Sequence, residues 1–137
     1  MLRTLMFLLL AMPFAASAAE ANDPPVIGGC GIWPHTRCAG ADLRHANLAG
    51  KNLAGADFSG AKMARVDLRG AMLAGANFDG ADLTGAKLGK ATAPTATFRC
   101  ARLVGADLEF ARIFRADFTV ADLTAANLEA AKANFSW

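Results

Sequence analysis

The chain has 137 residues, of which 54% are apolar and 19% charged, with a formal net charge of +2 at pH 7. This length is enough for one domain, and such a balance of charge predicts neither strong attraction to nucleic acid nor an acidic, DNA-like surface. Loss of residues 1–18 would remove one basic residue, Arg3, and leave 13 basic against 12 acidic side chains. The rest of the chain is therefore close to neutral.

Residues 1–18 have the features of a signal peptide in the order that export requires. Arg3 supplies a short positive start, Leu5–Phe14 is an apolar core too short to span a bilayer, and Ala16-Ser17-Ala18 is a small-residue cleavage site. A buried N-terminal helix is the alternative. We expect a periplasmic or secreted protein, cleaved near Ala18, with no membrane-spanning segment after the cleavage site.

Residues 19–40 are expected to form a linker and an N-terminal cap, because Asn22–Pro25 and Gly28-Gly29 interrupt regular structure. Residues 41–135 then count in fives. Two positions before each central residue, Ala occurs in 17 of 19 repeats, the exceptions being Lys51 and Val66. Seventeen of the 19 centres are bulky and apolar.

Each five predicts one short side and one corner. Residues two apart on an extended segment point the same way, so the Ala and the centre face inward while the residue between them faces outward. The last two residues turn the chain, and Gly occupies the second of them in eight repeats. Units this short bury their apolar face only by stacking on one another.

Runs such as ADLRH, ANLAG, ADFSG, ANFDG and ADLTG resemble the pentapeptide-repeat family. The resemblance implies an all-β fold, a right-handed quadrilateral β-helix (solenoid) of about five coils with 20 residues each. Two columns spaced by 20 support this register independently. One contains all the Phe centres, and the other is an outward column of alternating charge: Phe58, Phe78, Phe98 and Phe118; Asp42, Lys62, Asp82, Arg102 and Asp122.

The two ends of a stacked coil expose unpaired backbone groups and need caps. Trp33 and Cys38 fall in phase with the centres, so we expect them to plug the first coil. At the other end, Phe135 and the C-terminal residues 136–137 either close the core or form a homodimer contact, since the family resemblance implies end-to-end pairs.

Three cysteines in an exported chain suggest one disulfide and one leftover thiol. Cys38 and Cys100 lie about three coils, roughly 14 Å, apart, beyond the ~7 Å limit for a bridge. We therefore expect a Cys30–Cys38 disulfide and a free, inert Cys100 at a corner. Lipid attachment to Cys30 is disfavoured because Glu20–Pro25 separate it from the apolar core. A metal site is a further alternative, although its spacing matches no zinc pattern: Cys30, His35, Cys38 and His45.

One side of the coil, called the irregular side below, departs from the pattern. Only here are some centres small, and Pro94 predicts a bulge or distorted edge. An aromatic–arginine patch on this side has the composition of interface cores and is the candidate protein-binding site: Phe110, Arg112, Phe114 and Arg115. Ordinary surface variation is the alternative interpretation.

The sequence predicts no enzyme, no cofactor and no metal. After residue 18 there are two histidines, two serines and no tyrosine, and His45 and Cys100 fall in different coils, so they form no nucleophile–base pair. We expect an exported structural or interaction scaffold with an unknown protein partner. The family resemblance also offers a DNA-mimicking binder or protector of gyrase, which the export signal, near-neutral charge and surface Lys and Arg disfavour. A redox role of Cys100 is a third hypothesis.

Overall fold

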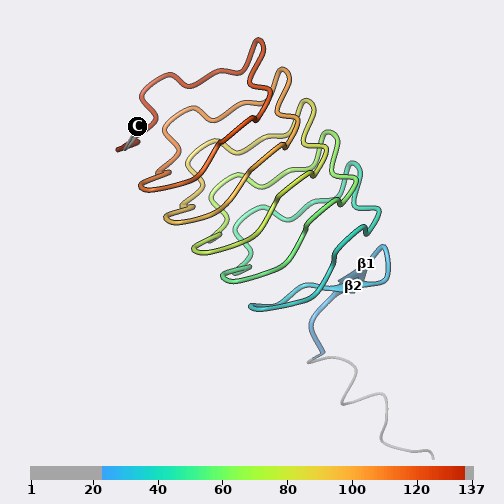
Figure 1. The fold of residues 1–137 in the computed structure, drawn as a ribbon. Coiled ribbons are helices and arrows are strands. Elements are labelled where there is room, and N and C mark those ends of the chain that lie inside the picture. The colour runs from blue at the N-terminus through green and yellow to red at the C-terminus, as the bar shows by residue number, and fades with distance from the viewer. Residues whose placement is uncertain (1–22, 135–137) are drawn as a thin grey trace, which may run out of the picture.

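The computed structural model describes residues 23–134, most of which form a stack of similar coils along one axis (Figure 1). Residues 1–22 and 135–137 lie outside the described residues. The predicted signal peptide and the predicted C-terminal closure or homodimer contact fall there. Within the described range, no helix is long and apolar enough to cross a membrane.

A small hairpin precedes the coils. Strand β1 (Val26–Ile27) pairs antiparallel with β2 (Cys30–Gly31), and Figure 1 places both at one end of the stack. Gly28 and Gly29 connect them with φ angles of 59° and 77°. Two successive positive φ angles are what a two-residue hairpin turn requires. The prediction that these glycines only interrupt a linker is therefore wrong: they form the turn of a paired element.

The coils are joined by parallel bridges between residues 20 positions apart, from Arg37–Asp57 through to Arg112–Lys132. The N–H of Leu43 donates to the carbonyl of Lys62 at 2.7 Å, and the N–H of Lys62 donates to that of Ala41 at 2.9 Å. Each side holds one bridged residue before the chain turns, so the coils contain isolated bridges rather than long strands. The predicted 20-residue register is thus present in the backbone.

Every fifth residue from His35 to Ala130 has a positive φ angle. In the corners the N–H of the following residue, usually Ala, donates back to the carbonyl of the centre three residues earlier, as Ala46 does to Leu43 at 3.1 Å. A positive φ at the third residue of such a turn is the pattern of a type II turn, which favours Gly. The structure thereby explains why glycines recur at this position of the repeat.

The core consists of the centres and the Ala two positions before them. Four stacked rings run through it, with centroid separations of 5.3 Å for Phe58–Phe78, 4.9 Å for Phe78–Phe98 and 4.7 Å for Phe98–Phe118. The first three rings are fully buried. The aromatic column expected from the spacing is confirmed.

The predicted plug of the first coil is only partly right. Cys38 is buried, whereas Trp33 is 43% exposed and Ile32 takes the interior place beside the disulfide. The ring of Trp33 lies over Gly31, where an added Cβ would come within 1.7 Å of it. Only glycine therefore lets the indole lie against the backbone outside the core.

Pro94 causes no bulge, contrary to the prediction. Thr92 keeps its bridges to both Met72 and Arg112, and the Pro94 carbonyl accepts the N–H of Gly75 at 2.9 Å. At this position of the repeat, directly after the centre, the N–H takes no part in the ladder between coils. Proline therefore removes no ladder hydrogen bond here, although it would in a regular strand.

The last described coil is less covered than the others. Phe118 and Leu123 are partly exposed and Leu128 is 39% exposed, whereas the equivalent Phe98, Leu103 and Leu108 are buried. The apolar core thus extends to this end of the described chain.

Candidate binding surface

The four residues of the aromatic–arginine patch lie on a single coil. Phe110 stands at the corner where the chain enters the irregular side, Arg112 is the outward residue of that side, and Phe114 and Arg115 form the next corner. Phe110 is 50% exposed, both arginines are exposed, and Phe114 is partly buried. The positions of these side chains agree with the sequence prediction that they share one surface.

Within the patch, the guanidinium of Arg112 lies over the ring of Phe114, 5.8 Å from its centroid. This cation–π contact holds a long side chain in one place. The backbone beneath is also fixed: Arg112 bridges to Thr92 and Lys132, and the Thr95 N–H donates to the Phe114 carbonyl at 2.9 Å. The patch therefore has a rigid base, which lowers the entropic cost of binding.

A groove of about 630 Å³ runs beside Phe110. Small residues from other coils line it along the same edge: Gly89 in the adjacent coil and Gly70 one coil further away. Sequence reasoning missed this groove, because it depends on the volumes of side chains contributed by several coils. It is lined by Ala49, Arg69, Gly70, Gly89, Lys90, Asp107, Glu109 and Phe110.

The outward carboxylates serve the coil itself. Asp42 accepts hydrogen bonds from the Arg44 side chain at 2.8 and 2.6 Å and from its backbone N–H at 3.3 Å. These bonds lower the pKa of Asp42 to about 2. The side chain of Arg69 lowers the pKa of Asp67 in the same way, and the hydroxyl and N–H of Thr84 lower that of Asp82.

The alternating column is in the expected register, but its strongest contacts differ from the prediction. Asp42, Lys62 and Asp82 are bridged in succession. Yet each acid bonds within its own corner, to the residue two positions later, and no ion pair joins neighbours of this column in the described part of the chain. Attraction along the column is a secondary contribution.

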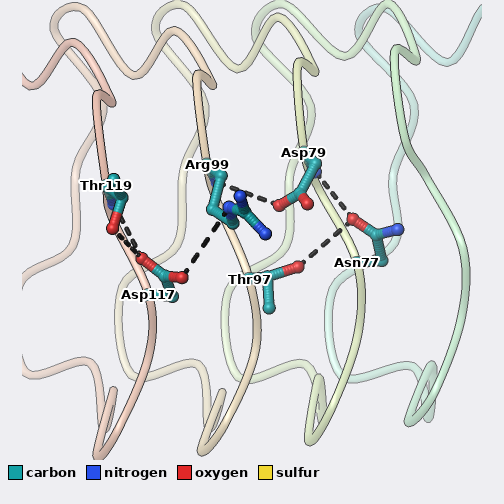
Figure 2. Close-up of polar contacts among 6 residues, drawn as sticks. All are labelled: Asn77, Asp79, Thr97, Arg99, Asp117 and Thr119. Atoms are coloured by element: carbon teal, nitrogen blue, oxygen red, sulfur yellow. Dashed lines mark hydrogen bonds and ion pairs between the residues drawn. The ribbon is translucent and has the colours of Figure 1, made fainter.

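A polar ladder lies outside the aromatic column, on the same side of the coil (Figure 2). The Thr97 hydroxyl donates to the amide oxygen of Asn77 at 3.2 Å, and the Arg99 N–H donates to Asp79 at 2.9 Å. Arg99 also pairs with Asp117 at 3.9 Å. In the coil before, the side chain of Asn77 accepts the N–H of Asp79, two residues later. Thr97 has no carboxylate or amide oxygen to accept the Arg99 N–H in the same way, so Asp79 accepts it instead. These groups thus satisfy one another and form a structural network.

The disulfide expected between Cys30 and Cys38 is present, with Cα atoms 5.5 Å apart. Both sulfurs are therefore used, which leaves no thiolate for the metal alternative with His35 and His45. The described residues contain no group of three potential metal ligands. Cys100 is a free, exposed cysteine at a corner.

The shifted carboxyl groups of the described residues all have lowered pKa values. Local hydrogen bonds lower them, whereas a general acid usually needs a raised carboxyl pKa. The imidazole of His35 packs on Gly55, where an added Cβ would come within 2.3 Å of its Nδ1 atom. Its position has a structural reason.

Comparison with protein families shows matches to a model described as pentapeptide repeats, with eight copies over residues 36–73, 62–99, 76–113 and 101–134. The matched segments together cover well over half of the chain. The chain belongs to the pentapeptide-repeat family. The family assignment agrees with the resemblance seen in the repeats, and it implies the right-handed quadrilateral β-helix. Curated proteins include no significant match.

Solved pentapeptide-repeat structures resemble this one. Rfr23 from the cyanobacterium Cyanothece 51142 is 29% identical with a TM-score of 0.61, covering 69% of this chain and 60% of its own. A thylakoid-lumen protein of Arabidopsis thaliana is 33% identical, with a TM-score of 0.41 and coverage of 65% and 66%. QnrB1, a plasmid-mediated fluoroquinolone resistance protein, is 21% identical, with a TM-score of 0.44 and coverage of 65% and 64%.

Of these three, Rfr23 alone has a TM-score above 0.5, so it is the one that bears on the fold. This pentapeptide-repeat chain spans about 60% of the length of Rfr23.

Proposed function

We propose that this chain is a non-enzymatic, exported interaction scaffold that binds a protein partner through the aromatic–arginine patch. In this proposal about five coils of the β-helix form a rigid rod, and the patch is the part that makes contact. Export is supported by the Cys30–Cys38 disulfide, because such bonds persist mainly in oxidising compartments. The signal-like order of residues 1–18 supports it further.

The observation that carries the proposal is the half-exposed ring of Phe110 beside the stacked Arg112–Phe114 pair. Aromatic and arginine side chains dominate the energetically important positions of protein interfaces. The fixed base of the patch and the adjoining groove give it a shape that a partner can complement. Most other outward residues are charged or small, and several of the acids among them bond to the residue two positions later, as Asp42, Asp67 and Asp82 do.

A DNA-mimicking role remains the less favoured alternative. It requires a strongly acidic surface, whereas the outward columns here contain Lys62, Arg102 and Arg112 beside the acids. Addition of the mature chain to a gyrase supercoiling reaction tests this role. We expect no inhibition and no protection; either effect would favour the alternative.

The proposal is tested by affinity capture with the tagged mature chain from an envelope fraction, followed by mass spectrometry. Alanine substitution of Phe110, Arg112, Phe114 and Arg115 should abolish capture of the enriched partner. The melting temperature should change little because no fully buried core side chain is removed. A matched control replaces exposed residues at equivalent positions of another side, Arg102 and Val120, and should keep the partner. Capture that survives the fourfold substitution contradicts the proposal.

A further inference from the structure

The irregular side has no acidic residue. Its described segments, residues 51–55, 71–75, 91–95, 111–115 and 131–134, contain four basic residues and neither Asp nor Glu. Each of the other three sides has acids in its outward column, such as Asp57, Asp67 and Asp82. A net charge of +4 on one side contrasts with the near-neutral balance of the whole chain. The basic residues are Lys51, Arg112, Arg115 and Lys132.

Three of these four cations gather at one end of the side. Arg112 and Lys132 are bridged neighbours in successive coils, where rungs lie about 4.8 Å apart, and Arg115 stands at the adjoining corner. Their side chains are exposed. Like charges on adjacent rungs repel, and the three ion pairs among the described residues all lie elsewhere. The cluster therefore lacks an internal counter-charge.

The geometry of the aromatic–arginine patch favours carboxylates as the counter-charge. The ring of Phe114 lies on one side of the Arg112 guanidinium, 5.8 Å from centroid to Cζ, and the Arg112 side chain is exposed and in none of the ion pairs of the described residues. A fixed guanidinium edge offers two parallel N–H donors, which match one carboxylate. Phe110, 50% exposed, stands at the corner before Arg112, and Met72, 47% exposed, lies two rungs from Arg112 beyond Thr92.

We propose that this end of the irregular side binds an acidic polypeptide segment that carries an aromatic or aliphatic residue among its carboxylates. The inference rests on the proposed function and specifies the chemistry of the partner. Arg112, Arg115 and Lys132 would receive the carboxylates, and the exposed ring of Phe110 would contact the apolar residue.

Two other anionic surfaces fit less well. A membrane attracts about 1 kcal/mol per basic residue and usually requires four to eight of them, whereas this end of the irregular side offers three: Arg112, Arg115 and Lys132. Single-stranded nucleic acid is bound largely by stacking bases on aromatic rings, but Arg112 already covers one face of Phe114.

Fluorescence anisotropy tests the proposal with two labelled 12-residue peptides of defined composition. One contains alternating Glu and Gly with one Trp, and in the other every Glu is replaced by Gln. The mature chain should bind the Glu peptide at least tenfold more tightly than the Gln peptide. Affinity should fall as salt rises, because the Debye length shortens from about 10 Å at 0.1 M to about 3 Å at 1 M.

Two triple variants with equal charge changes locate the binding site. The variant Arg112→Gln/Arg115→Gln/Lys132→Gln should weaken binding of the Glu peptide roughly tenfold or more, since each lost pair contributes up to about 1 kcal/mol. The control neutralises the equivalent outward and corner positions on another side and should stay within about twofold of the unmodified chain. It is Lys62→Gln/Arg65→Gln/Arg102→Gln.

Equal losses in the two variants would overturn the proposal, because attraction would then reflect overall charge alone. Equal binding of the Glu and Gln peptides would overturn it too. Tighter binding to vesicles with phosphatidylglycerol, or to a 12-nucleotide single strand, would assign the surface to another partner class. If the Glu peptide fails while alanine substitutions still abolish capture of a protein, the acidic class is wrong and the proposed function stands.

Discussion

Replacement of Phe78 by Ala is the sharpest perturbation of the fold. Phe78 is fully buried and has a ring on either side, Phe58 at 5.3 Å and Phe98 at 4.9 Å. Removal of a buried Phe costs about 3–5 kcal/mol, depending on how far the cavity collapses. Collapse is limited here because coils above and below are fixed by bridges 20 residues apart. We therefore expect a loss of about 4–5 kcal/mol in the free energy of unfolding.

Phe118 provides the matched comparison. It ends the column, has one described ring neighbour at 4.7 Å, and is partly exposed. Phe118→Ala should cost about 1–2 kcal/mol, because the burial removed is smaller and the gap can fill with solvent. Urea denaturation followed by circular dichroism measures both variants. A loss below about 2 kcal/mol for Phe78→Ala, or one no larger than for Phe118→Ala, would refute the stacked-column reasoning.

Three further substitutions examine a corner, an acid and the cap. Val120 is 78% exposed with a φ of 60°, so Val120→Gly should raise the free energy of unfolding by about 1 kcal/mol by removing strain; a loss in urea denaturation would contradict this. The pKa of Asp42 is about 2 in the folded chain, below its ordinary value of 3.8, so its contribution to stability is full above pH 3.8 and disappears as the pH falls through about 2. Arg44→Gln should return the pKa of Asp42 toward 3.8 in an NMR titration, and an unchanged value would mean that the Arg44 hydrogen bonds do not lower it. Replacement of both Cys30 and Cys38 by Ser should lower the free energy of unfolding by about 2–3 kcal/mol, because the disulfide closes a short loop. The Cys100→Ser control should leave that free energy unchanged. Equal melting temperatures of the two variants would show that the disulfide does not stabilise the fold.

The repeat could be predicted from sequence because its signal is local and recurs many times. The 20-residue register was implied by the family resemblance and supported by the Phe column and the column of alternating charge, and the backbone bridges agree with it. Corners allow a positive φ for any residue at some cost, as Phe110 and Cys100 show. The loss of Gly at a corner therefore did not signal a break in the coil.

The errors have physical reasons that sequence spacing does not contain. Trp33 is in phase with the centres, yet Gly31 leaves room for its ring against the backbone outside the core. Pro94 is tolerated because its position needs no donor in the ladder. The alternating column suggested contacts between coils, but each acid reaches the nearer donors two residues later, as Asp42 does to Arg44. Short-range hydrogen bonds prevailed over attraction between rungs.

The 20-residue register predicts which residues share a coil, and this is the only part of the binding surface that could be predicted from the sequence. The register placed Phe110, Arg112, Phe114 and Arg115 on one coil, and it could have revealed the absence of acid on the irregular side. It could not show that Arg112 stacks on Phe114, because that depends on side-chain rotamers. The groove beside Phe110 likewise depends on side-chain volume across several coils.

Site-specific photocrosslinking tests the central claim most directly. A benzoyl-phenylalanine replaces Phe110 in one variant and Val120 in another; both are exposed corner residues, with φ angles of 57° and 60°, on different sides of the coil. Irradiation in an envelope fraction should give a discrete crosslinked protein from position 110 and none from position 120. The same crosslinks from both positions, or crosslinks from position 120 alone, would contradict binding through the aromatic–arginine patch.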